Sequence, residues 1–556
     1  MTATAAAATQ IKAKGLPRGH VLVIGAASVG TIFEWYDFYL YASLAGVITK
    51  QFFSGVNETT GYILALMAFG AGFVVRPFGA VLFGRLGDLW GRKNTFLVTM
   101  LVMGLSTFVV GLLPSYASVG LMAPLALVGM RLLQGLAIGG EYGGAAIYVA
   151  EHAPPGKRGL YGSFIQTTAT IGLLLSLILI LAIRRWTGED AFAAWGWRLP
   201  FLISAGLLAV SMWIRLKLNE SPVFTRMVAE GRRSTRPLKD AFADAANVKR
   251  MAIAFLGVHA GQAVVWYTAQ FYALSFLQRM LKVEDGTSNL LMALALAIAT
   301  PFFVLFGWLS DKVGRKPVLL AGFLLAILTA FPLFKALTVA ANPALATAAA
   351  TTPVVVTADP KGCSLQFDPV GKALFVSPCD IAKAALASTG TPYRSEAAAA
   401  GTPVTVRVGA TTIQSFSGVG MAPADFAKRQ AAWRGDLGKA LTGAGYPAKA
   451  DPAAVNQPLT LALLVALILG ATMVCGPIPA MVVEMYSARI RYTSMSLAFH
   501  LGNGWFGGFM PTIAFALVAA TGNLYFGLWY TVGVAAVSLV LSLLFLPETR
   551  HADIDA

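Results

Sequence analysis

The stretch GRLGDLWGRK occupies residues 84–93, and a close copy, GWLSDKVGRK, occupies residues 307–316. Both copies are charged, although 57% of the chain is hydrophobic and only 12% of it is charged. In soluble domains, about a quarter of the residues are charged. Together with a mean hydropathy of +0.68, this composition predicts a membrane protein that contains an internal repeat.

Apolar stretches of about 20 residues, the length that a helix needs to cross a bilayer, recur on both sides of the decapeptides. Alternation with a period of two is absent, so helices are expected and a barrel is not. The sequence predicts an all-α membrane protein with twelve transmembrane helices in two six-helix halves. The predicted spans are residues 21–49, 59–83, 94–113, 121–150, 160–183, 198–217, 250–278, 288–309, 317–336, 458–484, 493–520 and 525–546.

Lysine and arginine are unevenly distributed over the predicted loops. With the N-terminus inside, 23 of them lie in inner loops and tails, and 5 lie in the short outer loops. This asymmetry predicts that both termini are cytoplasmic. Because the basic residues lie in separate loops, the net charge of +16 indicates anionic headgroups as their partner, and no nucleic acid is expected. No removable signal peptide is evident at the N-terminus.

The repeat reveals an insertion. Gly84 and Gly307 begin the two decapeptides, and Glu151 and Glu484 end spans four and ten. Equivalent positions of a duplicated chain should keep one offset, but the two glutamates are much farther apart in sequence than the two glycines. The difference places an insertion of about 110 residues after the second decapeptide. From about residue 340 to 456 the apolar pattern is broken by Pro, Thr, Asp and Lys.

By topology this insertion lies outside the cytoplasm, where disulfides persist. It contains Cys363 and Cys379, for which we predict a disulfide, with two free thiols as the alternative. Cys475, in span ten, is expected to pack in the membrane. The predicted division of the chain is a tail at 1–20, a half at 21–217, a central loop at 218–249, helices seven to nine at 250–336, a periplasmic insertion at 337–457, helices ten to twelve at 458–546 and a tail at 547–556.

Several motifs carry a family resemblance. The decapeptides resemble the loop signature of the major facilitator superfamily, RLLQGLAIGG at 131–140 resembles its span-four signature, and NESPVF at 219–224 and PETR at 547–550 resemble the ends of its halves. A narrower resemblance is to the metabolite:proton symporters, which include permeases for 2-oxoglutarate, citrate, shikimate and proline or betaine. The stretches that resemble this family are FEWYDFYLY at 33–41, VVRPFGA at 74–80, GGEYGGAAIYVAEHAPPGKRG at 139–159 and WGWRLPF at 195–201. The resemblance covers most of the chain and leaves out the insertion. It implies a secondary transporter of a bacterial inner membrane that works by alternating access, with protons as coupling ion and no other cofactor.

The decapeptides predict a cytoplasmic gate. Glycines permit tight turns and close helix approach, and an aspartate accepts hydrogen bonds from arginines and from amides at a helix start. We expect Asp–Arg contacts to hold the halves together when the cavity opens outward; a positive-inside anchor is the alternative. The residues assigned to this gate are Gly84, Asp88, Arg92, Asp311 and Arg315, with Lys316 beside them.

Charges inside the membrane are costly and need partners. Glu34 and Asp37 share one face of span one, and Arg131 in span four is the expected counter-charge, with Glu141 on the same helix. A carboxylate cluster of this kind can exchange a proton for an ion pair. We assign proton coupling to Glu34, Asp37, Arg131 and Glu141; static bracing of helices one and four is the alternative.

Arg76 precedes a proline in span two, and its planar guanidinium can hold a carboxylate through two hydrogen bonds. It is the first candidate for substrate recognition, and Arg198 is the second, with an interfacial anchor as its alternative. We expect Glu34, Asp37, Arg76 and Arg131 to point into one shared central chamber.

The second half contributes a less charged wall, in HAGQAVVWYTAQFY of span seven and FHLGNGWFGGFMP of span eleven. His259 and His500 are interpreted mainly as hydrogen-bonded helix linkers, and glycines as packing devices. The residues assigned to substrate binding are Arg76, Gln134, Tyr142, Arg198, Gln262, Trp266, Tyr267 and Asn503.

No phosphate loop, metal motif or Cys–x–x–Cys unit occurs, so an enzyme and a metal site are not expected. The predicted function is proton-driven import of a small organic acid by a monomer in the lipid bilayer. Proton-coupled efflux of an amphiphilic compound is one alternative function, and a mainly aromatic cavity without an arginine would favour it. A second alternative is a transport-sensor or receptor that uses the insertion.

Overall fold

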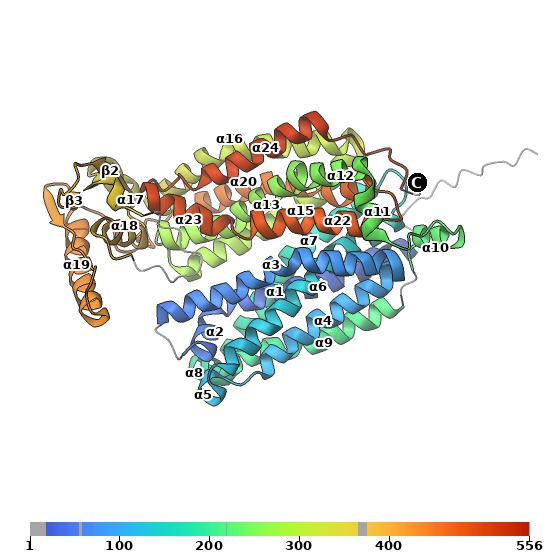
Figure 1. The fold of residues 1–556 in the computed structure, drawn as a ribbon, viewed down its shortest axis with the longest axis horizontal. Helices are drawn as coiled ribbons and strands as arrows, with labels where there is room; N and C mark the ends of the chain where they lie inside the picture. The colour runs from blue at the N-terminus through green and yellow to red at the C-terminus, as the bar shows by residue number, and fades with distance from the viewer. Residues whose placement is uncertain (1–17, 55–57, 218–219, 365–374, 555–556) are drawn as a thin grey trace, which may run out of the picture.

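The computed structural model describes residues 18–54, 58–217, 220–364 and 375–554. It consists of two helix bundles that are followed along the chain in Figure 1 from blue to red. The N-terminal bundle contains α1 (Arg18–Ser43), α3 (Glu58–Trp90), α4 (Arg92–Leu112), α6 (Met122–His152), α7 (Arg158–Thr187) and α9 (Arg198–Leu216). Its short connecting helices are α2 (Ala45–Phe52), α5 (Tyr116–Val119), α8 (Glu189–Ala191) and η1 (Phe192–Gly196).

A central segment with α10 (Pro222–Ala229) and α11 (Pro237–Ala243) leads to the C-terminal bundle. Its first long helix, Ala245–Met280, is assembled from α12 (Ala245–Ala252), η2 (Ile253–His259), α13 (Ala260–Tyr267), η3 (Thr268–Tyr272), α14 (Ala273–Ser275) and η4 (Phe276–Met280). The others are α15 (Asp285–Val313), α16 (Arg315–Ala341), α20 (Gln457–Cys475), α21 (Ile478–Glu484), α22 (Arg491–Leu501), η6 (Gly502–Gly507), α23 (Met510–Thr521) and α24 (Leu528–Phe545). Helix α16 continues to Ala341, beyond the predicted end of its span at residue 336.

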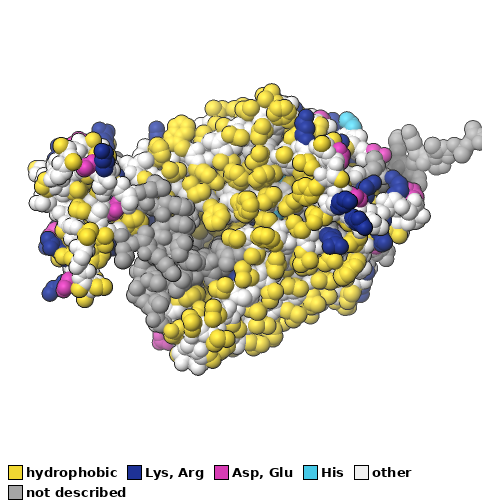
Figure 2. Space-filling view, viewed as in Figure 1, with side chains coloured by type: hydrophobic (Ala, Val, Ile, Leu, Met, Phe, Trp, Pro, Cys, Tyr) yellow, Lys and Arg dark blue, Asp and Glu magenta, His cyan; other side chains and the backbone are white. Residues whose placement is uncertain are grey.

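Within the described residues, ten helices are long and apolar enough to cross a membrane. The flank of the molecule in Figure 2 is covered by hydrophobic side chains, and basic side chains gather at the end that carries α10 to α12. This distribution is the one expected of a bundle surrounded by lipid with a positively charged end. The two bundles converge at this end and diverge toward the opposite end (Figure 1).

The backbone turns between α3 and α4 and between α15 and α16 are the same. Gly91 has φ +102° and Gly314 has φ +108°, and each immediately precedes the first residue of the next helix. These positive φ angles are accessible to glycine and strained for other residues. The eighth position of each decapeptide is therefore a glycine because the turn requires one.

Residues 343–364 and 375–443 form an α/β segment at the diverging end of the C-terminal bundle (Figure 1). It contains α17 (Pro343–Thr351), β1 (Val354–Ala358), η5 (Pro360–Gly362), α18 (Pro378–Ser388), β2 (Tyr393–Ala397), β3 (Thr405–Val408), β4 (Thr411–Gln414) and α19 (Pro423–Gly443). The sheet order is β2-β1-β3-β4. Strands β1 and β2 pair in parallel across the α18 crossover, with Val356 opposite Ser395, and the remaining pairs are antiparallel.

Hydrogen bonds attach the α/β segment to the C-terminal bundle. The amide of Tyr393 donates to the carbonyl of Gly522 at 3.0 Å. Just after α19, the carbonyl of Pro447 accepts a hydrogen bond at 2.8 Å from the ammonium of Lys282. Asn342, which caps α17, also donates to the carbonyl of Leu281 at 2.9 Å. The segment is thus held by the ends of several helices of one bundle.

A disulfide joins Cys363 to Cys379, and the Cα atoms of the two residues are 5.2 Å apart. Cys379 lies in the first turn of α18. Replacing both cysteines by serine is expected to destabilise the α/β segment by about 3 kcal/mol, because the bridge closes a loop of 16 residues. Limited proteolysis of the intact protein should cleave this segment faster in the double variant and not in Cys475→Ser. Recovery of two free thiols at 363 and 379 by non-reducing mass spectrometry would contradict the bridge.

Candidate functional site

The decapeptide aspartates cap helices of the opposite bundle. Asp88, in α3, accepts hydrogen bonds from the amides of Tyr492 at 3.2 Å and Thr493 at 3.0 Å, in the first turn of α22. Asp311, in α15, accepts hydrogen bonds from the amides of Gly159 at 2.9 Å and Leu160 at 2.8 Å, in the first turn of α7. A carboxylate at a helix N-terminus satisfies free amides and interacts favourably with the helix dipole. The two bundles therefore cap each other reciprocally.

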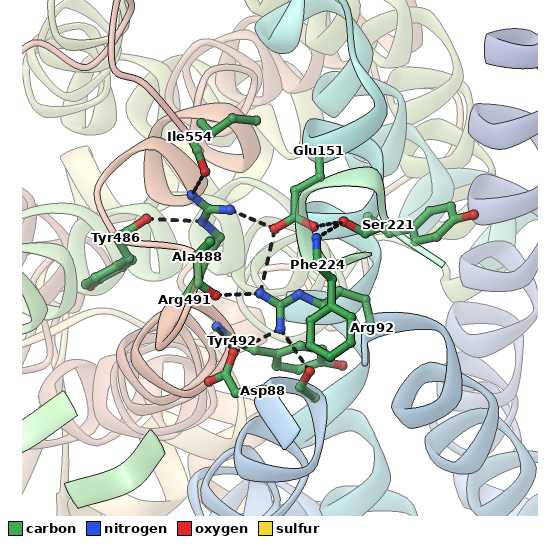
Figure 3. A network of polar contacts seen from close by, with 12 residues as sticks. Asp88, Arg92, Glu151, Ser221, Phe224, Tyr486, Ala488, Arg491, Tyr492 and Ile554 are labelled. Carbon is green, nitrogen blue, oxygen red and sulfur yellow. Dashed lines mark hydrogen bonds and ion pairs between the residues drawn. The ribbon is translucent and has the colours of Figure 1, made fainter. Parts of the chain in front are cut away.

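A buried ion-pair network surrounds Asp88 (Figure 3). Glu151, at the end of α6, lies 2.7 Å from Arg491 of the opposite bundle and 3.7 Å from Arg92 of its own. It also accepts a hydrogen bond from the hydroxyl of Ser221. The side chains of Glu151, Arg92 and Arg491 are fully buried, so their charges depend on one another for compensation.

The C-terminal bundle repeats this arrangement. Glu484, at the end of α21, lies 3.1 Å from Arg315 of its own bundle and 3.7 Å from Arg158 of the opposite bundle. Thr549 donates a hydrogen bond to it at 2.8 Å. Two equivalent networks thus join the bundles at their converging end, and we call them together the closing network.

The predicted Asp–Arg contacts need correction. Asp88 pairs with Arg92 at 3.1 Å and Asp311 pairs with Arg315 at 2.7 Å, but each pair is four residues apart within one bundle. They therefore do not connect the halves, and Lys316 donates to the carbonyl of Leu543 within its own bundle.

The connections between the bundles come from the aspartates at helix starts and from the Glu–Arg pairs. Arg92 adds a hydrogen bond at 2.6 Å to the carbonyl of Ala488. Arg158 and Arg491 were not among the residues predicted for the gate, although each lies seven residues after the glutamate that ends the preceding span, in both halves. This repeated spacing was the available signal.

Glycine permits the close approach of the bundles at Gly84. A Cβ atom at this position would lie 2.9 Å from the Cα atom of Thr493, the residue that Asp88 caps. The first residue of this decapeptide must therefore be small, since α3 and α22 approach each other closely there.

The central segment is also attached to this end. Arg489 forms an ion pair at 2.9 Å with Asp240 of α11, which accepts a hydrogen bond from Ser234 at 2.6 Å. The hydrogen bond from Ser234 is the main cause that lowers the pKa of Asp240, and Arg489 acts in the same direction.

A central pocket of about 40 Å³ lies between the two bundles. From the predicted substrate-binding set it is lined by Arg76, Tyr142, Gln262, Trp266, Tyr267 and Asn503. Thr31, Trp35, Ile138, Gln166, Ala169, Phe499 and His500 complete the lining. A volume of this size accommodates little more than water, so the aromatic walls must separate to admit a metabolite.

Arg76 supplies a permanent positive charge to this pocket. Its guanidinium lies 4.1 Å from the ring centroid of Phe73 and interacts with the side chain of Tyr267. Arg76 is only 4% exposed. A buried guanidinium beside aromatic rings is suited to bind a carboxylate through directed hydrogen bonds.

Polar groups of the C-terminal bundle face Arg76 across the pocket. Asn503 donates to Gln262 at 3.0 Å, and a ring nitrogen of His259 lies 3.5 Å from the same Gln262 oxygen. His500 is fully buried, and neither of its ring nitrogens has a hydrogen-bond partner in the described part of the chain. The π-helical turns η2, η3 and η6 flank these residues, and such turns are frequent at functional sites. The interpretation of His500 as a hydrogen-bonded linker is therefore not what its surroundings show.

The acidic residues of the N-terminal bundle lie elsewhere. Asp37 and Glu141 line a separate cavity of about 10 Å³ among α1, α4, α6 and α9. Arg131 lies close enough to Asp37 to interact with it electrostatically, and its guanidinium stacks 3.5 Å from the centroid of Tyr41. Arg215, near the end of α9, pairs with Glu141 at 3.4 Å and was not among the residues predicted for this cluster.

The expectation of one shared chamber is therefore wrong for these residues. Arg76 lines the central pocket, whereas Asp37 and Glu141 line the smaller cavity inside one bundle. The side chain of Glu34 lies outside the described part of the structure.

Two predicted substrate ligands do not line the central pocket. Arg198 donates to the carbonyls of Gly111 at 2.9 Å and Leu113 at 2.6 Å, which end α4. A cation there satisfies free carbonyls and complements the helix dipole. Gln134 donates to Thr107 at 2.7 Å inside the N-terminal bundle. Both side chains therefore connect helices of one bundle.

Several known proteins are similar in sequence to this chain. The family model described as sugar (and other) transporter matches residues 22–251 and 438–556. A putative metabolite transport protein of Haemophilus influenzae is 38% identical over 306 residues, covering 53% of this chain and 68% of the relative. The shikimate transporter of Escherichia coli is 36% identical over 314 residues, covering 55% of this chain and 70% of the relative.

A proline/betaine transporter of Salmonella typhimurium is 35% identical over 318 residues, covering 56% of this chain, and the matched part spans 63% of that transporter's length. Among solved structures, a double Trp mutant of XylE has a TM-score of 0.64 at 15% identity, with 97% of this chain and 98% of that chain covered. The same protein, described as a major facilitator superfamily proton:xylose symporter, gives a TM-score of 0.60 when bound to a bromodeoxyglucose, covering 96% of this chain and 98% of that one.

These relatives are membrane transporters and not enzymes. The likeness to XylE establishes the fold, and the family model covers more than half of the chain. The chain belongs to the sugar (and other) transporter family and has the fold of the major facilitator superfamily.

Proposed function

We propose that the protein is a secondary active transporter that imports a small carboxylate-bearing metabolite together with protons across a bacterial inner membrane. The observation that carries this proposal is Arg76 in a buried, aromatic-walled pocket between the two bundles. Relatives named as shikimate and alpha-ketoglutarate carriers are consistent with an anionic substrate. Efflux of an amphiphilic compound is less well supported, because an arginine lines the pocket.

The aromatic walls leave room for a second substrate class. Trp35 and Trp266 lie 6.1 Å apart between ring centroids, and Trp266 and Tyr267 lie 5.0 Å apart. A quaternary ammonium group is bound by aromatic faces, so a zwitterion could place its carboxylate at Arg76 and its cation against these rings. The relatives named as proline/betaine transporters motivate this candidate.

Alternating access is supported by the closing network. It holds the bundles together at the end where basic side chains gather (Figures 1 and 3), and its release would open the central pocket toward that end. We assign this end to the cytoplasm from the lysine and arginine distribution. Helices α1 and α3 added to the ten spans make twelve, with the α/β segment as a periplasmic insertion.

Proton coupling is assigned to the cluster of Asp37, Glu141, Arg131 and Arg215, with Glu34 on the same helix as Asp37. Buried carboxylates beside arginines can alternate between an ion pair and a protonated, neutral form as hydration changes. Arg131 and Glu141 of this cluster belong to α6, which also carries Tyr142 of the central pocket. Substrate binding and proton binding can therefore influence each other through one helix.

Asp37→Asn is expected to abolish accumulation driven by a pH gradient while substrate exchange in its absence persists, since the variant keeps the side-chain shape but cannot release a proton. The measurement is uptake and counterflow in proteoliposomes, with the exposed Asp190→Asn as the matched control. If accumulation by Asp37→Asn and by Glu34→Gln still follows the pH gradient, the carboxylates only brace the helices.

The substrate class is tested by thermal stability of the purified protein with mono-, di- and tricarboxylates, shikimate-like acids and betaines. A ligand that binds the folded state raises the unfolding temperature by mass action. The compound that stabilises the protein is then supplied to proteoliposomes with an imposed pH gradient. Stabilisation only by compounds without a carboxylate would overturn the proposal.

A further inference from the structure

A second cavity, of about 440 Å³, lies where the α/β segment meets the C-terminal bundle. Its walls come from the end of α16, from α17, β1 and β2, and from the loop between α23 and α24. It is far larger than the central pocket, and we call it the junction cavity. None of the assigned sites uses it.

The charge of the junction cavity is positive. Lys335 of α16 and Arg394 of β2 both line it, and no Asp or Glu is among its lining residues. Neither side chain forms an ion pair within the residues that the structure describes. The cavity is therefore complementary to an anion.

The walls are fixed in place by internal hydrogen bonds. The hydroxyl of Tyr525 donates to Thr338 at 3.0 Å, that of Tyr446 donates to the carbonyl of Thr352 at 2.8 Å, and that of Tyr393 donates to the carbonyl of Ala519. All three tyrosines line the cavity, and their hydroxyls donate to other groups of the protein. The cavity thus combines two cations with apolar walls.

The depth of Lys335 places it at the membrane surface. Arg315, which belongs to the closing network, begins α16, and Lys335 lies near the other end of the same helix. At a rise of 1.5 Å per residue, the two positions are separated along the helix axis by about 30 Å, the thickness of the hydrocarbon core. One turn before Lys335, Phe331 packs 5.0 Å from Trp529, which is 55% exposed, and exposed tryptophans mark the headgroup boundary.

The membrane helix that lines the junction cavity lies on the outer side of the C-terminal bundle (Figure 1). Helices α16 and α24 pack together on the side of the C-terminal bundle that faces away from α3, α4 and α9 (Figure 1). The α16 wall of the junction cavity therefore lies away from the N-terminal bundle, and none of the residues that line this cavity lines the central pocket.

We propose that the junction cavity binds the headgroup of an anionic phospholipid, whose phosphate is paired with Lys335 from the membrane helix and Arg394 from the α/β segment. The leaflet is the one opposite the closing network, the periplasmic leaflet in the proposed orientation. The lipid would connect the α/β segment to the bilayer surface and fix its tilt relative to the bundle. Because this site is remote from Arg76, it does not depend on the substrate assignment.

The test is native mass spectrometry of the full chain, titrated with phosphatidylglycerol and with phosphatidylcholine of identical acyl chains. The double variant Lys335→Gln and Arg394→Gln should lose about thirtyfold of the phosphatidylglycerol affinity, with phosphatidylcholine binding unchanged. The matched control is Lys361→Gln with Lys439→Gln, which removes two exposed charges from the same segment outside the cavity and should change affinity little. Equal unfolding temperatures without lipid verify that both double variants are folded.

Two results would overturn the proposal. Unchanged phosphatidylglycerol affinity in the Lys335→Gln and Arg394→Gln protein would show that the lipid binds elsewhere. Equal stabilisation of the wild-type protein by soluble glycerol phosphate, which has the phosphate and no acyl chains, would assign the cavity to a soluble anion instead.

Discussion

Arg76→Gln is expected to lower the affinity for the carboxylate ligand by about a hundredfold and to abolish uptake, because a charged partner is removed from a buried pocket. Arg76→Lys should retain part of the binding, about a tenfold loss, since an ammonium keeps the charge but not the planar pair of donors. The measurement is ligand titration of the purified protein, followed by thermal shift or calorimetry, with the compound identified in the screen.

Arg198→Gln is the matched control for this series. Arg198 is also an arginine within a helix of the N-terminal bundle, but it holds the carbonyls that end α4 and does not line the pocket. This variant should lower the unfolding temperature and leave ligand affinity unchanged. Full affinity in Arg76→Gln, or loss of affinity only in Arg198→Gln, would contradict the assignment of the pocket.

The double variant Glu151→Gln with Glu484→Gln is expected to release the closing network and to reduce uptake severely. Each substitution leaves buried arginines without compensation, and breaking a buried pair in this way costs about 3–5 kcal/mol. The free-energy difference between the closed and open forms of this end should change by about the same amount. The equilibrium between the two forms should consequently shift by more than a hundredfold.

Cys475 provides a native reporter of this change. It is buried in α20, its carbonyl accepts a hydrogen bond at 3.0 Å from Gln166 of the central pocket, and it lies nine residues before Glu484. Alkylation of this thiol by N-ethylmaleimide should accelerate in the double variant. Glu189→Gln, which breaks an exposed pair with Arg184, is the matched control and should have no effect. Equal alkylation rates in all three proteins would exclude release of the network.

The helical membrane fold, its internal repeat and its extra segment could be predicted from the sequence. Hydropathy locates long apolar helices because every backbone polar group must be satisfied inside the membrane. The fixed offset between Gly84 and Gly307 revealed the repeat, and the larger offset between Glu151 and Glu484 revealed the extra segment. The fold of that segment, an α/β arrangement around a four-stranded sheet, was not indicated by any pattern in its sequence.

The partners of the charged residues at the helix ends were not predictable. In α9 the charged residues are Arg198 and Arg215, which lie at its two ends. Arg198 holds α4, whereas Arg215 pairs with Glu141, and the pattern of α9 alone names neither partner. Arg76 was easier to place, because an arginine in the middle of a span must find a buried partner or a ligand.

The most direct test of alternating access through the closing network is the distance between nitroxide labels at Asn94 and Lys312, measured by pulsed electron resonance in a Cys475→Ser background. Both positions are exposed, at the converging ends of α4 and α15 in opposite bundles. The wild-type protein should show a single population of distances, and the Glu151→Gln with Glu484→Gln protein should show a second population at longer distance. Superimposable distance distributions in the two proteins would contradict the claim that buried charges hold this end closed.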